Sequence, residues 1–249
     1  MGRVAFVQGA SRGLGLALAS ELASRDEIDA VYASSRNPEA SEGLVALRER
    51  RGTRVRPLAL DLRSESSIAS AAKNVASEQR ELHLVISAAG VLHEDEIQPE
   101  KRYEQVHHAG MEHAFAVNAY GPMLTARHLL PLVSRDDRVV IANISAHAGS
   151  ITDNHLGGWY SYRASKAAQN MFTRTLAIEL SRRAPNVICV ALDPGTMATE
   201  LSRPYRRNVH AGTIASPEEA AVRLLALIDS LDGEQSGRFL RWDGHVIPW

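Results

Sequence analysis

Short apolar runs alternate with longer stretches of helical periodicity along this chain. The runs are VAFVQ (4–8), DAVYAS (29–34), VRPLAL (55–60), LHLVIS (82–87), RVVIANIS (138–145) and NVICVAL (186–192). Each has the length of a strand and lacks regular polar alternation, as in strands that are buried on both faces. Apolar residues at helical spacing occupy the stretches between them, 15–25, 41–52, 64–79, 113–133 and 165–183. The repeated strand–helix order predicts an α/β fold, a doubly wound parallel sheet flanked by helices.

Composition narrows the class of protein without changing this picture. The chain has no internal repeat, low-complexity tract or obvious linker, so we expect residues 1–249 to form a single domain. With 28 basic and 29 acidic side chains, its net charge of −1 disfavours nucleic acid and membrane surfaces as partners. The single cysteine, Cys189, lies in an apolar run, and the first apolar run is too short for a signal peptide. We therefore expect a cytoplasmic protein.

The first predicted strand ends in GASRGLG (9–15), and a helix follows at once. Gly9 permits a tight turn, Gly13 lets backbone amides approach a pyrophosphate, and Gly15 allows close packing of helix on strand. The N-terminus of the helix then offers unpaired N–H groups and the positive end of its dipole to phosphates. This arrangement predicts a dinucleotide-binding site.

The second strand ends in Ser34, Ser35 and Arg36, where NAD-binding sites of this kind usually place a carboxylate. A guanidinium can hold the additional 2′-phosphate of NADP by charge-assisted bonds. Arg12, inside the glycine loop, adds a second positive charge. The two arginines favour NADP(H) over NAD(H), with solvated surface charges as the alternative interpretation.

The next two strand ends add further candidates. The Asp61 carboxylate is placed to accept a hydrogen bond from the adenine amino group, or alternatively to cap the following helix. The small residues SAAG (87–90) let the backbone pass close to a ribose. The candidate cofactor residues of this half are Gly9, Ser11, Arg12, Gly13, Leu14, Gly15, Arg36, Asp61, Leu62, Ala88, Ala89 and Gly90.

Tyr162 and Lys166 are spaced i, i+4 and therefore lie on one face of a helix. A free phenol has a pKa near ~10, too high for acid–base work at neutral pH. A neighbouring ammonium stabilises the phenolate and lowers that pKa. Tyr160 has Ala164 at the same offset and lacks such a partner. Tyr162 is accordingly the candidate proton donor.

Together these motifs resemble those of the short-chain dehydrogenase/reductase family, in order and over nearly the whole chain. They are GASRGLG, Asp61, SAAG, Asn118, a strand-end serine, YRASK (162–166) and the proline–glycine pair of DPGTMAT (193–199). More narrowly, GSITDNHLGGWYSYRASKAAQN (149–170) and the ending WDGHVIPW resemble the bacterial C-factor and sniffer-type carbonyl reductases. The resemblance implies a Rossmann-type fold with RFLRW (238–242) as its last strand. It also implies NAD(P)-dependent oxidoreduction of a carbonyl/alcohol pair by a homodimer or homotetramer.

The resemblance also implies roles for individual residues. Tyr162 is the general acid in reduction and the base in oxidation, and Lys166 binds the nicotinamide ribose and lowers the pKa of the tyrosine. Asn118, followed by Gly121-Pro122, marks a helix break whose carbonyl holds a water that bridges to the lysine. The residues implied to lie against the carboxamide end of the nicotinamide are Pro194, Gly195 and Thr196, with Thr199 close behind.

One departure concerns the serine that orients the substrate carbonyl. In the family it stands three residues before a glycine, and here that position holds Ala146. Ser145 is one residue early, which in a strand points to the opposite face. We favour Ser145, turned inward by a bulge, as the catalytic serine, then Ser150, and then a site without serine that uses His147. Loss of one hydrogen bond to a developing oxyanion costs roughly 100-fold or more in rate.

The remaining features are less specific. The histidines show no metal-ligand spacing on one element, so we expect no metal. His147, His155 and Trp159 are candidates to line the substrate pocket, and the polar, arginine-rich segment 199–212 is interpreted as a substrate-binding lid. We expect an NADPH-dependent carbonyl reductase or alcohol dehydrogenase acting on a small molecule. The alternatives are an NAD-dependent dehydrogenase and a non-catalytic protein that senses dinucleotides.

Overall fold

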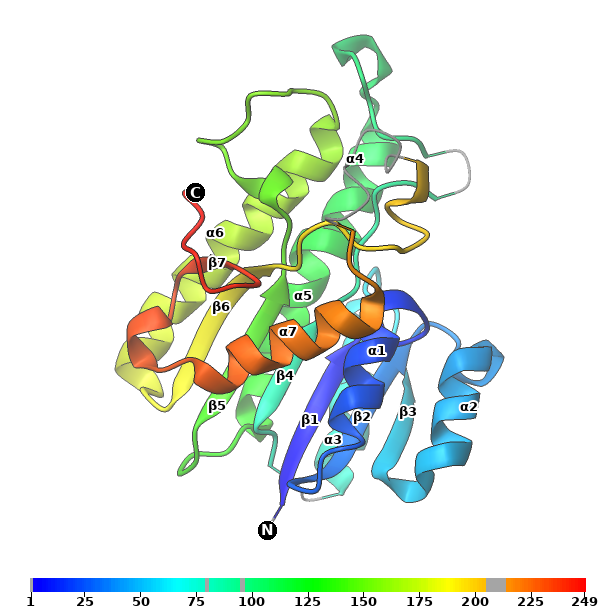
Figure 1. Ribbon diagram of the computed structural model, residues 1–249, viewed down its shortest axis with the longest axis vertical. Helices are drawn as coiled ribbons and strands as arrows, with labels where there is room; N and C mark the ends of the chain where they lie inside the picture. Colours follow the sequence, from blue (N-terminus) through cyan, green and yellow to red (C-terminus); the bar gives the residue numbers. More distant parts are fainter. Residues whose placement is uncertain (1, 79–80, 95–96, 205–213) are drawn as a thin grey trace.

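The strands predicted from the apolar runs form one parallel sheet. The computed structural model describes residues 2–78, 81–94, 97–204 and 214–249. Within these ranges the sheet has seven strands in the order β3-β2-β1-β4-β5-β6-β7 (Figure 1). They are β1 (Arg3–Gln8), β2 (Ile28–Ser35), β3 (Val55–Ala59), β4 (Leu84–Ser87), β5 (Val139–Ile144), β6 (Val187–Asp193) and β7 (Phe239–Arg241). The predicted doubly wound sheet is confirmed, including its last strand.

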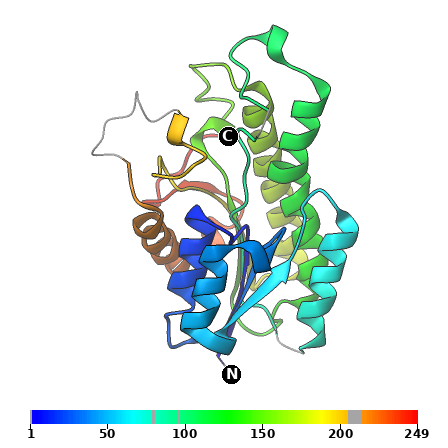
Figure 2. The ribbon, with the colours of Figure 1, turned by 90° about the vertical axis from the view of Figure 1, so that its right-hand side faces the viewer.

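Helices cover both faces of this sheet. They are α1 (Gly13–Leu22), α2 (Glu42–Arg51), α3 (Glu65–Ser77), α4 (His108–Phe115), α5 (Gly121–Leu129), α6 (Tyr160–Arg183) and α7 (Pro217–Ser230). Figure 2 shows α1, α2 and α7 on one side and α3, α5 and α6 on the other. Two separate groups of buried apolar side chains fill the two interfaces between sheet and helices. No described helix is both long enough and apolar enough to span a membrane.

Helix α6 begins five residues earlier than its apolar periodicity predicts. The start is supported by a distant residue, because the buried Glu100 carboxylate accepts hydrogen bonds from the backbone N–H of Ser161, at 3.2 Å, and from its hydroxyl. A carboxylate at a helix N-terminus satisfies orphan N–H groups and complements the helix dipole. The extension brings Tyr162 into the first turn of α6.

A π-helical turn, Ala116–Tyr120, joins α4 to α5. The expected helix break at Gly121-Pro122 is therefore a bulge within a continuing helix. Gly121 is needed there, because a Cβ added to it would lie 2.6 Å from the carbonyl oxygen of Ala116. Such turns displace side chains from their ordinary helical register, and this one carries Asn118.

Candidate active site

The glycine loop between β1 and α1 forms a cradle suited to a dinucleotide. Gly9 and Gly13 have φ angles of +83° and +55°, a region that favours glycine. A Cβ on Gly9 would lie 2.7 Å from the backbone of Ala89, and one on Gly15 only 2.1 Å from the carbonyl oxygen of Gly9. Among the described residues, no side chain caps the N-terminus of α1 at Arg12. Its first N–H groups thus fit a phosphate, as the sequence predicts.

Several other candidate cofactor residues lie at the same edge of the sheet. Thr199 lies against the loop, with its Cγ2 3.5 Å from the position of a Cβ built on Gly13. At Gly90, after β4, a built Cβ would lie 3.6 Å from Asn118 Oδ1 and 3.7 Å from Lys166 Nζ. The residues predicted for the phosphates, the ribose and the catalysis therefore face one another beyond the carboxyl ends of the strands.

The charged candidates at the adenine end are engaged in ion pairs. Arg36 Nη2 lies 2.8 Å from Glu94 Oε1, and the other oxygen of Glu94 lies 2.9 Å from Nε2 of His113. Asp61 accepts bonds from Arg63, which hold the pKa of its carboxyl below its usual value. Ser64, not Asp61, caps α3. A 2′-phosphate would therefore compete with Glu94 for Arg36.

Asn118 connects the π-helical turn to the segment that follows β4. Its Oδ1 accepts from the backbone N–H of Val91 at 2.8 Å, and its Nδ2 donates to the carbonyl of Val91, also at 2.8 Å. The same Nδ2 lies 3.0 Å from the hydroxyl of Ser165 on α6. The side chain is fully buried. Asn118 thereby connects Val91, the residue after the SAAG segment, to the helix that carries Tyr162 and Lys166.

Tyr162 and Lys166 lie one turn apart on α6, and both are buried. The amine of Lys166 donates to the carbonyl of Ile144 at 2.7 Å and to Gln169 Oε1 at 3.0 Å. An ammonium has three donors, so one N–H remains beside Gly90. The i, i+4 pair predicted from sequence is thus present, next to the place where a ribose would lie.

The electrostatics differ from the expectation that the lysine lowers the pKa of the tyrosine. In the structure, burial and then the negative charge of Asp193 raise the pKa of Tyr162 above its ordinary value. Burial lowers the pKa of Lys166 to about 7, and Asp193 opposes this shift. The reason is desolvation, which disfavours both charged forms. In this state the phenol keeps its proton at neutral pH.

The two candidate serines already donate their hydroxyl protons within the protein. Ser145 Oγ donates to Asn170 Oδ1 at 2.7 Å, and Ser150 Oγ donates to the carbonyl of Pro248 at 2.6 Å. A hydroxyl has one proton to donate. Ala146 is extended and has no polar side chain. His147, the third possibility, is more than half exposed, with Nε2 3.3 Å from Asp153 Oδ2.

Aromatic and acidic groups complete the surroundings of the tyrosine. The ring of Trp159 packs edge-on against Tyr162, with 6.2 Å between centroids. A small hollow beside the phenol is lined by Val91, Leu92, Ile97, Gln98, Pro99, Glu100, Gly110, His113, Ala114, Ser161 and Tyr162.

Within the described ranges, no three His, Cys, Asp or Glu side chains gather closely enough to hold a metal. Residues 205–212 of the predicted lid lie outside the described residues.

Three residues near the site escaped the sequence analysis. Asp193, which stands before Pro194-Gly195, is buried, and burial raises the pKa of its carboxyl even though the N–H groups of Gly195 and His147 bond to it. Its place at a strand end was the available signal. Glu100 and Gln169 gave no local signal, because their roles depend on contacts made only in the folded chain.

Comparison with known proteins identifies the family. Residues 3–210 match the family model described as short chain dehydrogenase. Over 190 residues the chain is 32% identical to 1-hydroxy-2-glutathionyl-2-methyl-3-butene dehydrogenase of Rhodococcus sp. (strain AD45), covering 76% of this chain and 78% of that protein. It is 34% identical to C-signal of Myxococcus xanthus over 145 residues, 58% of this chain and 81% of that one.

Solved structures show the same fold. The NADPH-bound carbonyl reductase from chicken fatty liver superposes with a TM-score of 0.88 at 27% identity, covering 100% of this chain and 99% of that chain. The carbonyl reductase Sniffer of D. melanogaster gives a TM-score of 0.86 at 24% identity over 100% of both chains, a likeness of fold. The resemblance inferred from the motifs is confirmed.

The buried amine predicts a pH-dependent stability. Its pKa is about 7 in the folded chain and near ~10.4 in an unfolded one, so between these values the unfolded chain binds the extra proton. Stability from this group should therefore rise with pH. From about pH 6 to about pH 9, the free energy of unfolding of the parent should gain about 2 to 3 kcal/mol relative to Lys166→Met. Urea denaturation of both proteins over this pH range measures the difference. Parallel pH profiles of the free energy of unfolding would show that the pKa of the Lys166 amine is not lowered by folding.

Proposed function

The chain belongs to the short chain dehydrogenase family, and from this premise we propose that it is an NADPH-dependent carbonyl reductase. The observation that carries the proposal is the buried pair of Tyr162 and Lys166, whose amine lies beside Gly90 at the edge where the glycine loop forms its cradle. Hydride transfer is the chemistry that the nicotinamide supplies when bound. The residues of the chain bind the cofactor, orient the substrate and protonate its carbonyl oxygen.

The proposed roles follow from the donors available. Tyr162 donates its hydroxyl proton to the substrate carbonyl oxygen, and the remaining N–H of Lys166 holds the nicotinamide ribose hydroxyls. Asn118 keeps the π-helical turn and α6 in register through its bonds to Val91 and Ser165. The set proposed to receive the carboxamide end of the cofactor is Pro194, Gly195, Thr196 and Thr199.

The raised pKa of Tyr162 supports the direction of reduction. A protonated phenol is the form that can act as an acid, and burial keeps this form at neutral pH. The alkoxide that develops on the substrate is a stronger base than a phenolate, so transfer of the proton remains favourable. Oxidation would instead require the phenolate, which burial and Asp193 both disfavour.

Preference for NADPH over NADH is proposed from the charges at the end of β2. Arg36 is half exposed and Arg12 stands in the glycine loop, where both can reach a 2′-phosphate. The chicken carbonyl reductase was solved with NADPH bound. An NAD-dependent dehydrogenase is the alternative.

We further propose a cytoplasmic homodimer or homotetramer. Three large apolar side chains of α6 are exposed, Met171 at 65%, Phe172 at 37% and Ile178 at 46%. Exposed apolar area of this kind is typical of surfaces that pair. The free thiol of Cys189, fully buried in β6, is compatible with a reducing compartment.

Replacing Tyr162 tests the catalytic proposal. Tyr162→Phe should lower the rate of NADPH oxidation with aldehydes, ketones or quinones by about 10²- to 10⁴-fold, because the acid is lost while the apolar packing is kept. Binding of NADPH, followed by fluorescence, should change little. Tyr160→Phe is the matched control, since Tyr160 is partly exposed and should be replaceable without loss.

Equal turnover by Tyr162→Phe and the parent would exclude Tyr162 as the acid. A parent that binds NADPH but turns over none of the carbonyl compounds would favour the second candidate, a dinucleotide-sensing protein. Ala146, together with the two engaged serines, is the observation in favour of that candidate.

Cofactor preference has its own pair of variants. Arg36→Met should weaken NADPH binding by about 10- to 100-fold and leave NADH binding nearly unchanged, because a charged hydrogen bond to the 2′-phosphate is lost. Glu94→Gln should tighten NADPH binding, because Arg36 is released from its ion pair. Glu104→Gln is the control for charge alone. Fluorescence titrations with NADPH and NADH measure binding by the parent and by the three variants. A parent that binds NADH more tightly than NADPH contradicts the proposal.

A serine placed at position 146 tests how the carbonyl is oriented. We propose that Tyr162 acts without a helping serine, so Ala146→Ser should raise kcat by about tenfold or more, part of what an oxyanion donor contributes. Ser145→Ala should leave kcat nearly unchanged, because its hydroxyl is committed to Asn170. Steady-state kinetics measure both effects. A fall of about 100-fold in the kcat of Ser145→Ala would instead make Ser145 the donor.

A further inference from the structure

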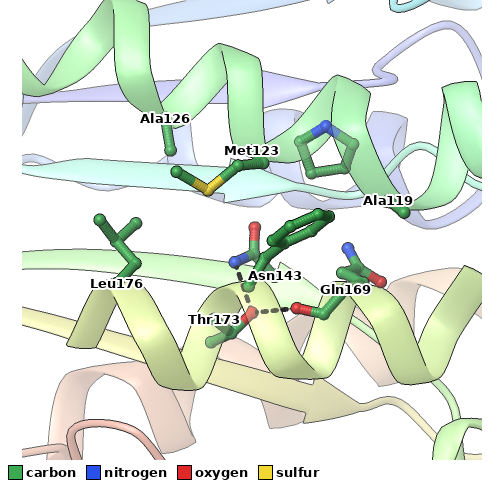
Figure 3. Close-up of a pocket in the computed structure, with 9 residues that line it drawn as sticks. Ala119, Met123, Ala126, Asn143, Gln169, Thr173 and Leu176 are labelled. Atoms are coloured by element: carbon green, nitrogen blue, oxygen red, sulfur yellow. Dashed lines mark hydrogen bonds between the residues drawn. The ribbon is translucent and has the colours of Figure 1, made fainter. Parts of the chain in front are cut away.

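A small pocket lies between α5 and α6 and is lined in part by Gln169, which accepts a hydrogen bond from Lys166. Figure 3 shows Asn143 of β5 and Gln169 and Thr173 of α6 at this pocket, with Ala119, Met123, Ala126 and Leu176 around them. It has room for about one water molecule. The proposed reaction leaves this pocket unused.

Two polar atoms at the pocket, Gln169 Nε2 and Asn143 Oδ1, have no hydrogen-bond partner among the residues that the structure describes. Gln169 is 1% exposed and Asn143 is 6% exposed, so bulk water does not satisfy them. One is a donor and the other an acceptor. Buried polar groups are generally paired with protein or with ordered water. A single water that accepts from Gln169 and donates to Asn143 would satisfy both.

The neighbouring contacts fix the orientation of both amides. The Lys166 amine can only donate when charged, so the oxygen of Gln169 faces it, at 3.0 Å, and the nitrogen points the other way. Asn143 Nδ2 donates to Thr173 Oγ1 at 2.9 Å, and that hydroxyl donates to the carbonyl of Gln169 at 2.8 Å. The oxygen of Asn143 is thereby left for the pocket.

We propose that Gln169 is a positioning residue for the Lys166 ammonium, itself held by one buried water that bridges Gln169 Nε2 to Asn143 Oδ1. Lys166, Gln169 and Thr173 share one face of α6, and the water ties that face to β5. With two of its donors engaged by Ile144 and Gln169, the amine directs its third toward Gly90. The inference rests on the proposed role of Lys166.

The contact also bears on the charge of the amine. A hydrogen bond to the charged form favours that form, so Gln169 opposes the lowering of the Lys166 pKa by burial. The titratable group whose charge acts on this amine is Asp193 of β6, which also raises its pKa. Tyr162, one turn away on α6, keeps its proton. Loss of Gln169 Oε1 should therefore release the proton at lower pH.

The test is a direct titration of the amine in protein without cofactor. The chain has three lysines, so selectively ¹³C-labelled lysine gives few NMR signals, and Lys73→Arg and Lys101→Arg assign them. In Gln169→Met the pKa of Lys166 should fall by about one unit, and in Gln169→Glu it should rise. Gln8→Met is the matched control, because Gln8 is equally buried and bonds to Thr125 instead.

Each outcome decides. An unchanged titration in Gln169→Met, or an equal fall in Gln8→Met, overturns the inference. If Gln169→Met does not fold, an upward shift in Gln169→Glu supports the positioning role, and its absence overturns it. A crystal structure of the parent should show one water bonded to Gln169 and Asn143, and a dry pocket overturns the bridge. Because the titration needs no turnover, an inactive parent would defeat the proposed function separately.

Discussion

The site depends on how the fold accommodates a lysine amine that is 3% exposed. A charged amine removed from water must regain its hydrogen bonds inside the protein or release its proton. Here the carbonyl of Ile144, at the end of β5, and the amide of Gln169 supply two of the three acceptors. The third N–H is left beside Gly90. One desolvated amine therefore links the end of a central strand, the long helix α6 and the glycine-lined edge of the sheet.

Most of the fold could be predicted from sequence because the central strands of its sheet are buried on both faces. Such strands are short continuous apolar runs, and each run here coincides with a strand to within one or two residues. The start of α6 could not be predicted, because the carboxylate that supports it belongs to Glu100, 61 positions from Ser161. In the sequence, Gly121-Pro122 was the only sign of the π-helical turn. Neither residue by itself specifies that the helix continues through a bulge that carries Asn118.

The residues of the candidate site were predictable by position, but their partners were not. Strand ends and helix spacing brought forward Gly9, Tyr162 and Lys166, because backbone geometry alone places those positions at one edge, whereas Asn118 was brought forward only by the family resemblance. The partners are long-range side chains: Asn170 for Ser145, and Glu94 for Arg36. Asp193 shows the same limit, since a carboxylate at a strand end gains its influence only when Tyr162 and Lys166 are folded against it.

The Asp193 carboxylate also explains how one buried site holds the phenol of Tyr162 and the ammonium of Lys166 without a large net charge. Its carboxylate raises the pKa of both Tyr162 and Lys166, so it favours a protonated phenol and a charged amine together. Desolvation acts on the two groups in opposite directions, keeping the phenol neutral and discharging the amine. At the amine the carboxylate acts against desolvation, and the proposed role of Gln169 adds to this effect. The state they favour, ammonium beside phenol, is the one that the proposed proton transfer to a carbonyl requires.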